Sequence, residues 1–452
     1  MVQNRGRFNS RIGIVLATAG SAVGLGNIWR FPYMTGQDGG AAFILLYIAF
    51  TLMLGIPGMI AEFVVGRHSS ANASRAYSMM SGRRSWGVIG LLGVVTSMII
   101  LGFYAVVAGW CLQYLFVSIA GGIHGDVTYV ERYFTEFSSD AVLPTVLTVV
   151  FIVLTHLVVT RGVRRGIERV SKILMPTLFI LLLIIVAASC SLPGSWRGVT
   201  FLFHPDFSVI NHSIMLDALG QSFFSLSLGT ACLCTYASYF NRETNLVKSA
   251  VSIASIDTVI AILAGLMIFP AAYSVGVNPD SGPALIFVTL PNVFQQAFGN
   301  IPAVGYAISI MFYALLSLAA LTSTRSMHEI GTAYIYEEFG LSRKSGAWIE
   351  TVVCCVIGVF CSLSMGAVDS LKIAGMRVLD FCDYITAQIM LPLGALLTCL
   401  FVGWVVKKQT VSDEFTNNGT SNRIFFSLWM FAVRVICPLS IIAIFLHQLG
   451  II

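Results

Sequence analysis

Apolar stretches of membrane-spanning length recur along almost the whole 452-residue chain, and they constrain its fold more than any other feature. A helix that crosses a bilayer needs roughly 20 mostly apolar residues. Eleven stretches meet that need: residues 11–36, 41–66, 87–120, 143–160, 166–189, 213–240, 247–273, 302–335, 347–366, 375–405 and 424–449. Because 57% of the residues are hydrophobic and only 10% are charged, a soluble domain of this size would leave apolar surface in water. The sequence predicts an all-α polytopic membrane protein with eleven transmembrane helices.

Basic residues gather in alternate connections between these stretches. One side carries Arg5, Arg7, Arg11, Arg67, Arg75, Arg83, Arg84, Arg161, Arg164, Arg165, Arg169, Lys172, Arg242, Lys248, Arg343, Lys344, Lys407, Lys408 and Arg423. The opposite side carries Arg132, Arg197, Lys372 and Arg377. Cytoplasmic loops are enriched in Lys and Arg, so we expect a multi-pass protein of the inner (cytoplasmic) membrane with its N-terminus in the cytoplasm and its C-terminus outside. Each basic cluster flanks an apolar span, which argues against a nucleic-acid partner.

The cysteines and the first apolar stretch have simple interpretations. Cys232 and Cys234 are separated by one residue and Cys354 and Cys355 are adjacent, so neither pair has the CxxC spacing of a redox or zinc site. We expect the ten cysteines to be small packing residues. The first stretch has a basic flank but no small-residue cleavage site, which predicts a retained helix rather than a signal peptide.

Two of the predicted spans are abnormal near their middle. The first contains Gly20, Gly24 and Gly26, and each glycine would cost about 1 kcal/mol in a continuous helix. The sixth gathers hydroxyls and glycine between Gly220 and Thr230 at a similar depth. Unwound backbone at the membrane midplane is tolerated only where it is buried in protein or lines a cavity. The alternative is two ordinary glycine-rich packing helices.

Spans 1 and 6 hold matching places in two sets of five, and interrupted helices at such places are typical of inverted-repeat transporters. We therefore predict a first repeat in residues 1–190, a second in 213–405 and an extra helix in 424–449. The polar loop 277–283 precedes a segment, 284–298, that is expected to form a short helix over the outer vestibule.

Several motifs together resemble one known family. They are Gly20–Pro32, Asp38–Ala41, Gly55–Pro57 with Glu62, Phe223–Gly229, Thr235–Tyr239 and Leu321–Ser323. With them, residues 5–405 resemble the neurotransmitter:sodium symporter family. Most members have twelve spans, and some bacterial members have eleven. The resemblance implies a helical transporter that works by alternating access, importing an amino acid with sodium, and not an enzyme.

The resemblance also implies two sodium sites, because an unwound helix exposes carbonyl oxygens of the kind that hard cations prefer. One, which we call the second sodium site, would use the carbonyls of Gly20, Val23 and Ala319 and the hydroxyls of Thr322 and Ser323. The alternative for the two hydroxyls is that they bond back to their own helix.

The other, the first sodium site, would use the Ala22 carbonyl and the side chains of Asn27, Ser225 and Asp257. Relatives usually carry asparagine at position 257, and an ionisable residue within an apolar span is a functional candidate by default. Chloride-dependent relatives hold chloride nearby, and the residues here that match its shell are Tyr47, Gln221 and Ser225. Asp257 would supply that negative charge covalently, which predicts chloride-independent transport. The alternative is a structural carboxylate satisfied by hydroxyls.

The resemblance implies an amino-acid site beside the first sodium site. The amides of Leu25 and Gly26 suit a carboxylate, and Tyr104 resembles the tyrosine that also holds it; a packing role is the alternative for Tyr104. Carbonyls of Ala22, Phe224 and Ser225 would bind the ammonium group. Side-chain selectivity would fall to Ile100, Phe224, Ser227, Thr230, Ser323 and Met327. Thr230 replaces a residue that is often bulky, and we expect a hydrophobic or aromatic substrate.

Alternating access requires a gate on each side of the site. The outer gate is predicted to pair Arg30 with Asp383, with Asp380 as the competing partner. The inner gate is predicted to pair Arg5 with Glu337. The aromatic residues expected beside these pairs are Tyr104 and Phe224 outside and Phe8 and Tyr239 inside.

The fifth span is expected to move. Gly166 and Pro176 enclose nine residues, and both residue types weaken a helix. The resemblance implies that this cytoplasmic end unwinds and admits water to the second sodium site. A static kink is the alternative.

The sequence leaves two other functions open. A channel or a non-transporting sensor on the same fold is one, although the polar residues concentrate at one depth rather than along a continuous stripe. A membrane enzyme is the other, although the seven histidines show no HExxH motif.

Overall fold

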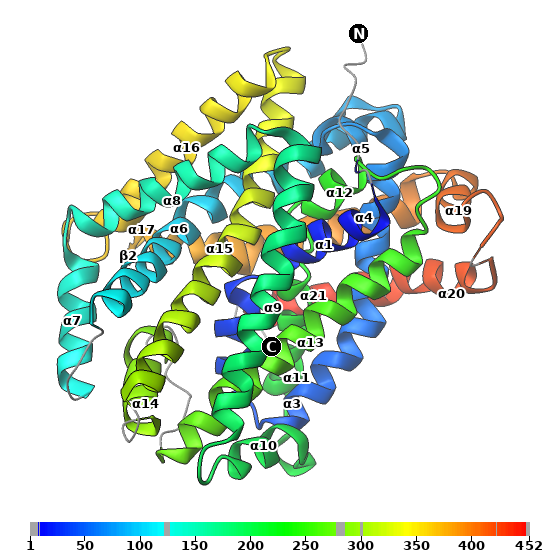
Figure 1. The fold of residues 1–452 in the computed structure, drawn as a ribbon. Helices are drawn as coiled ribbons and strands as arrows, with labels where there is room; N and C mark the ends of the chain where they lie inside the picture. Colours follow the sequence, from blue (N-terminus) through cyan, green and yellow to red (C-terminus); the bar gives the residue numbers. More distant parts are fainter. Residues whose placement is uncertain are drawn as a thin grey trace.

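The computed structural model describes residue 8 and residues 10–121, 127–276, 285–298, 302–421 and 423–448. Helices form one bundle in which most axes run between an upper and a lower end (Figure 1). The only strands in these ranges are β1 (Lys372–Ile373) and β2 (Met376–Arg377), which pair as an antiparallel hairpin. The all-α prediction is therefore confirmed.

Among the described residues, eight helical segments are long and apolar enough to cross a membrane: Ala41–Ser69, Arg84–Ala120, Val163–Cys190, Leu246–Ser274, Ala303–Glu338, Arg343–Leu363, Val378–Val405 and Arg423–His447. Their α-helical parts are α3 (Ala41–Phe50), α4 (Ile56–Ser69), α6 (Gly87–Ala120), α9 (Arg169–Cys190), α13 (Leu246–Ser274), α15 (Pro302–Glu338), α16 (Arg343–Leu363), α17 (Val378–Tyr384), α18 (Leu391–Leu400), α20 (Phe426–Phe431) and α21 (Cys437–Gln448). Several of them are joined by π-helical turns: Thr51–Gly55, Val163–Glu168, Ile385–Met390, Phe401–Val405 and Ala432–Ile436.

Helices also occupy the other three stretches predicted as spans; two of these belong to bent helix pairs, which bring the candidate spans among the described residues to as many as ten. The first is broken: α1 (Arg11–Ala22) is followed by a π-helical turn (Gly26–Arg30) and α2 (Phe31–Gln37), with a bend of 56°. The second is α8 (Leu143–Val159). The third is also broken, into α11 (His212–Ser225) and α12 (Cys232–Ala237). The two interruptions predicted in spans 1 and 6 are thus present.

Short helices cover the ends of the bundle. They are α5 (Ala73–Ser81), α7 (Val127–Ser139), α10 (Trp196–Phe203), α14 (Leu290–Ala297) and α19 (Lys408–Thr416). Three-residue 3₁₀ turns at Arg84–Trp86, Phe207–Val209 and Arg423–Phe425 and a π-helical turn at Leu285–Thr289 accompany them. In Figure 1, α5 lies at the upper end, whereas α10 and α14 lie at the lower end.

The short helix predicted in 284–298 is present from Leu285 onward. Phe287 stacks on Phe134 of α7, with ring centroids 5.3 Å apart, and meets Trp110 of α6 edge-on. Ala284 and the loop 277–283 lie outside the described residues, and the position of this helix over an outer vestibule stays a prediction.

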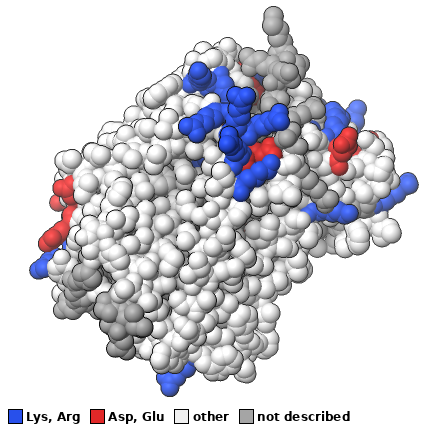
Figure 2. Space-filling model, in the orientation of Figure 1, with Lys and Arg blue, Asp and Glu red and all other residues white. Residues whose placement is uncertain are grey.

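Lys and Arg side chains gather at the upper end of the bundle, above a broad band without charge (Figure 2). Four arginines from the basic side of the sequence pattern are exposed: Arg161, Arg164, Arg165 and Arg169. Such a band matches the hydrocarbon layer of a bilayer, and the charge lies at one end of it as the alternating loops predict.

The interior is formed by long helices that pack side by side. α15 packs along α6, α9 and α16, and α1 packs against α9, α13 and α15, so α1 lies among long helices. The ten cysteines are free, and eight of them are buried, which fits packing roles.

The N-terminal part of the fifth span, which the sequence predicts to unwind, is helical in this structure. Val163–Glu168 is π-helical, α9 follows it directly, and Pro176 lies inside α9. A Cβ atom on Gly166 would lie 2.1 Å from the Val158 carbonyl oxygen, so only glycine allows this close approach. The unwinding of this segment stays a prediction.

An ion pair between Arg67 and Glu414 joins α4 to α19. Arg67 Nε lies 2.6 Å from Glu414 Oε2, and His68 Nδ1 lies 3.2 Å from Glu414 Oε1. Burial raises the pKa of the Glu414 carboxyl, but the hydrogen bond with His68 and the charge of Arg67 outweigh it, so the pKa lies below its ordinary value. The pair therefore stabilises the fold above the ordinary carboxyl pKa and loses this effect as the pH falls through the lower folded-state pKa.

We expect Glu414→Gln to destabilise the protein by about 3 kcal/mol at pH 7, because it leaves the buried Arg67 charge without its partner. The difference from the wild type should shrink near pH 4. Thermal unfolding in detergent at both pH values measures this. Asp413→Asn, which alters a carboxylate bonded to Gln409 on the same short helix, is the control and should change little. Equal effects of the two variants would show that the ion pair does not stabilise the fold.

Candidate functional site

The break in the first span exposes backbone groups in the middle of the bundle. After α1, Val23 adopts an extended conformation with φ −69° and ψ 109°, and Gly24 follows before helical structure resumes. A Cβ atom on Gly24 would lie 2.3 Å from Ser323 Oγ and 2.8 Å from the Tyr104 hydroxyl. Glycine at this position therefore allows α6 and α15 to approach the unwound backbone.

The break in the sixth span is longer and more strained. Between α11 and α12, Ser227, Gly229 and Ala231 all have positive φ, at 54°, 81° and 59°. A Cβ atom on Gly229 would lie 2.2 Å from the Leu391 carbonyl oxygen. Such conformations cost free energy and cluster at functional sites.

Glu62 of α4 satisfies amides that this break leaves open. Its Oε1 accepts from the Gly229 amide at 2.8 Å, and its Oε2 accepts from the Cys234 amide at 3.3 Å. An acidic side chain at the start of α12 also suits the positive end of that helix. In the sequence Glu62 is only one residue of a motif, and the structure gives it this capping contact.

All the residues that the sequence predicts for the substrate pocket line one cavity of about 320 Å³. They are Ala22, Leu25, Gly26, Ile100, Tyr104, Phe224, Ser225, Ser227, Thr230, Ser323 and Met327. They come from α1, the π-helical turn after it, α6, α11, the break before α12, and α15. The size lies within the range of small-molecule pockets.

Tyr104 meets the unwound part of the first span. Its hydroxyl oxygen accepts a hydrogen bond from the Leu25 amide at 2.9 Å. This amide belongs to the start of the second helical half of the span, where exposed N–H groups carry partial positive charge. A carboxylate placed here would meet an amide and a hydroxyl together.

Asp257 lies at the centre of a buried polar cluster that includes Asn27 of the first span. Its Oδ1 accepts from Asn27 Nδ2 at 2.8 Å, and its Oδ2 accepts from the hydroxyls of Ser225 and Tyr47 at 2.6 and 3.0 Å. The structure thus brings together the side chains predicted for the first sodium site. Tyr47 and Ser225, which match a chloride shell, both donate to the carboxylate instead.

Gln221, the third residue of the predicted chloride shell, is also buried. Neither its Oε1 nor its Nε2 has a hydrogen-bond partner among the described residues. The carboxylate of Asp257 and an unbonded amide therefore occupy the region where the resemblance implies a chloride in other family members.

Thr322 and Ser323 of α15 reach across to the first span. The hydroxyls lie 3.0 and 3.3 Å from the Val23 carbonyl oxygen. The Thr322 hydroxyl also donates to the carbonyl of Ala319 on its own helix at 2.7 Å, so the back-bonding alternative is seen for Thr322, and the sodium role of the two hydroxyls stays a prediction. Four of the five residues predicted for the second sodium site are joined by these contacts, and Gly20 lies on the adjoining turn of α1.

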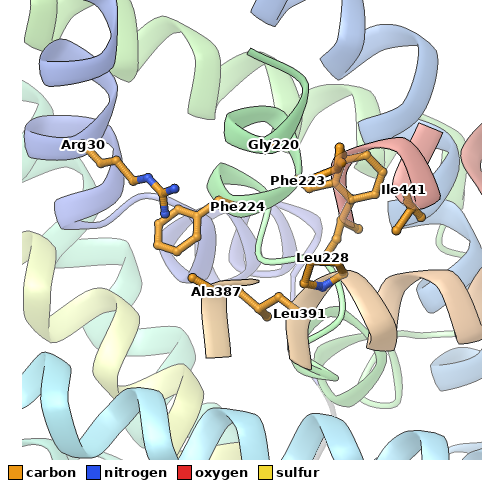
Figure 3. A pocket seen from close by; sticks show the side chains of 10 residues that line it. Arg30, Gly220, Phe223, Phe224, Leu228, Ala387, Leu391 and Ile441 are labelled. Atoms are coloured by element: carbon orange, nitrogen blue, oxygen red, sulfur yellow. The ribbon is translucent and has the colours of Figure 1, made fainter. Parts of the chain in front are cut away.

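The predicted outer pair is not closed in this structure. The Arg30 guanidinium lies over the Phe224 ring, 4.2 Å from its centroid, and Figure 3 shows its side chain directed at that ring. In the part of the chain described, no ion pair joins Arg30 to Asp383, although both line the cavity. Asp380, the competing partner, pairs instead with Arg377 at 2.6 Å.

The predicted inner pair cannot be followed, because Arg5 lies outside the described residues. Glu337 accepts from the amide and the side chain of Asn72 at 2.7 and 3.1 Å. Phe8 packs edge-on against Tyr239, with ring centroids 6.1 Å apart, as the sequence suggests. The Arg5–Glu337 latch stays a prediction.

A second ion pair near the inner end was missed in the sequence. Glu329, fully buried on α15, pairs with Arg343 of α16 and accepts from the Tyr239 hydroxyl at 2.6 Å. The partners are 14 residues apart on different helices, so no local pattern links them. In the sequence, the only indication of this ion pair was an acidic residue near the end of an apolar stretch.

Known proteins are similar to this chain over most of its length. The model of the sodium:neurotransmitter symporter family matches residues 5–140 and 124–451. An uncharacterised sodium-dependent transporter of Bacillus subtilis, YhdH, is 39% identical over 447 residues, which is 98% of each chain. An uncharacterised sodium-dependent transporter of Haemophilus influenzae is 32% identical and covers 99% of each chain.

Among solved structures, MhsT in complex with L-phenylalanine is similar to this chain with a TM-score of 0.89. The two are 39% identical, and the match covers 98% of this chain and 100% of MhsT.

Proposed function

Given that the chain belongs to the sodium:neurotransmitter symporter family and is a multi-pass, sodium-coupled transporter, we propose that it imports a hydrophobic or aromatic amino acid by alternating access. One observation carries the proposal. A cavity of about 320 Å³ brings an exposed amide and a tyrosine hydroxyl next to a buried polar cluster at the point where the first span is unwound.

The backbone supplies both ends of an amino acid with partners. The Leu25 amide and the Tyr104 hydroxyl suit a carboxylate, and carbonyls of Ala22 and Phe224 suit an ammonium group. The cavity wall otherwise holds apolar side chains such as Ile100 and Met327. A zwitterion with an apolar side chain fits these features, and the L-phenylalanine held by MhsT supports the same class of substrate.

Two sodium ions would accompany the substrate. The first would use Asn27, Ser225 and Asp257 with the Ala22 carbonyl, since these side chains already meet. The second would use Gly20, Val23, Ala319, Thr322 and Ser323. Sodium prefers the hard oxygen ligands that both sets offer.

The gates and the orientation belong to the same proposal. Arg30 and Asp383 would close the cavity from outside, and Arg5 and Glu337 would close it from inside. The basic end of the bundle would face the cytoplasm of an inner membrane, with the C-terminus outside. The repeats 1–190 and 213–405 would rock against one another, with 424–449 as an added helix.

Uptake into proteoliposomes tests the function. A sodium gradient should drive accumulation of radiolabelled phenylalanine or leucine, whereas a potassium gradient should not. Competition by the twenty amino acids then identifies the substrate class. Binding without accumulation would favour a non-transporting sensor, and uncoupled ion currents would favour a channel.

Tyr104→Phe should weaken amino-acid binding by about 1.5–3 kcal/mol, because a hydrogen bond to a charged carboxylate is lost while the ring remains. Scintillation proximity binding of the labelled substrate at saturating sodium measures it. Tyr33→Phe, which removes a hydroxyl elsewhere on the cavity wall, is the matched control. An unchanged affinity for Tyr104→Phe would remove this residue from the substrate site.

Transport should not depend on chloride, because the Asp257 carboxylate already accepts from Tyr47 and Ser225. Replacing chloride by gluconate on both sides of the membrane should leave the initial uptake rate unchanged. A rate that collapses in gluconate and recovers with chloride would contradict the role given to Asp257.

A further inference from the structure

Arg325 of α15 is the largest fully buried side chain among the described residues. It lies within one of the predicted apolar spans, three residues after Thr322 and two after Ser323. An arginine keeps its charge in proteins, and a buried charge is costly unless it is paired. Its presence beside the proposed second sodium site is therefore costly unless other groups compensate the charge.

The guanidinium contacts two of the residues expected to form that site. Its Nε donates to the carbonyl oxygen of Thr322 at 3.1 Å. Its Nη2 lies 2.8 Å from the position of a Cβ atom built on Gly20, so the two helices approach closely there. The remaining nitrogen, Nη1, donates to the Ile167 carbonyl oxygen at 3.3 Å.

Among the residues that the structure describes, no carboxylate pairs with this guanidinium. Within the described ranges Arg325 has no ion pair, and its Nη2 has no hydrogen-bond partner. Glu329, one turn further along α15, is engaged by Arg343. Glu168, next to Ile167, is bonded to Lys172 and Ser10.

The other polar groups near the guanidinium are neutral. Tyr236 bonds to Ser326, and Cys232 is a free thiol. The two carbonyl contacts stabilise the arginine, but they leave its full positive charge uncompensated. The charge therefore acts on whatever cation enters next to it, in surroundings where screening by water is weak.

We propose that Arg325 keeps the second sodium site at low affinity by electrostatic repulsion, an inference that rests on the function proposed above. Thr322 is shared: its hydroxyl faces the Val23 carbonyl and its own carbonyl binds the guanidinium. A sodium ion between Val23, Thr322 and Ser323 would lie next to a fixed cation. The first site contains Asp257 and has no such cation among its hydrogen-bonded partners.

This asymmetry orders the two sites. The site with Asp257 fills at low sodium, and the site beside Arg325 fills only at the higher sodium concentration outside the cell. In the sodium-poor cytoplasm the second ion would leave first. The arginine thus determines the concentration at which the second sodium binds and is released.

The test is a sodium-22 binding isotherm on the purified full-length protein in detergent, without amino acid. We expect two sodium-binding components, the weaker of which is the second site. Arg325→Gln should raise the affinity of this weaker component at least about tenfold, or make it detectable where the wild type shows only one. Arg325→Lys retains the charge and should leave the weak component weak. His328→Gln, on the next turn of α15 and bonded to Thr351, is the control without a change of charge.

A second variant keeps the test valid if Arg325→Gln does not fold. Cys232→Asp places a carboxylate near the unchanged guanidinium, so it should tighten the weak component as Arg325→Gln does. Sodium-dependent thermal shifts provide an independent readout of the same affinities.

Two outcomes would overturn the inference. One is a weak component with the same affinity in the wild type, Arg325→Gln and Cys232→Asp. The other is Arg325→Lys binding as tightly as Arg325→Gln, which would indicate a packing effect. Sodium-driven uptake by the wild type is measured separately, so a failure of the proposed function is distinguishable from a failure of this inference.

Discussion

Unwound backbone in the middle of a membrane must have its amide and carbonyl groups satisfied, and the arrangement of the site depends on that constraint. An unsatisfied group there costs several kcal/mol. Glu62 accepts from two amides at the break before α12, and Tyr104 accepts from the Leu25 amide. The Val23 carbonyl is met by hydroxyls of Thr322 and Ser323. Tyr104, Thr322 and Ser323, which stabilise the breaks, are also among the residues proposed to bind the substrate or sodium.

Much of this arrangement follows from local sequence. Three glycines within seven residues and a cluster of hydroxyls at the same depth weaken two helices at matching places, so the breaks can be predicted from composition along the span. The pocket residues follow from the resemblance to the family, which implies a pattern of site residues on α1, α6, α11 and α15. Their convergence on a single cavity agrees with that pattern.

What the sequence did not predict depends on contacts between distant helices or on the conformation adopted. Arg30 lies over Phe224 rather than against Asp383, and no sequence pattern distinguishes an open gate from a closed one. The Glu329–Arg343 pair joins α15 to α16. Arg325 reads as one cation in an apolar stretch, and only packing against Gly20 and Ile167 shows that it is buried without a carboxylate.

The buried arginine also connects the second sodium site to the fifth span. Ile167, whose carbonyl accepts from Arg325, belongs to the π-helical turn Val163–Glu168, where Gly166 permits contact with Val158. If this turn unwinds, the guanidinium loses a hydrogen bond and gains access to water. Water would also screen the charge, so the repulsion on a neighbouring sodium ion would be strongest while this turn stays wound. The conformation of the fifth span and the electrostatics of the proposed second sodium site would therefore be coupled through one side chain.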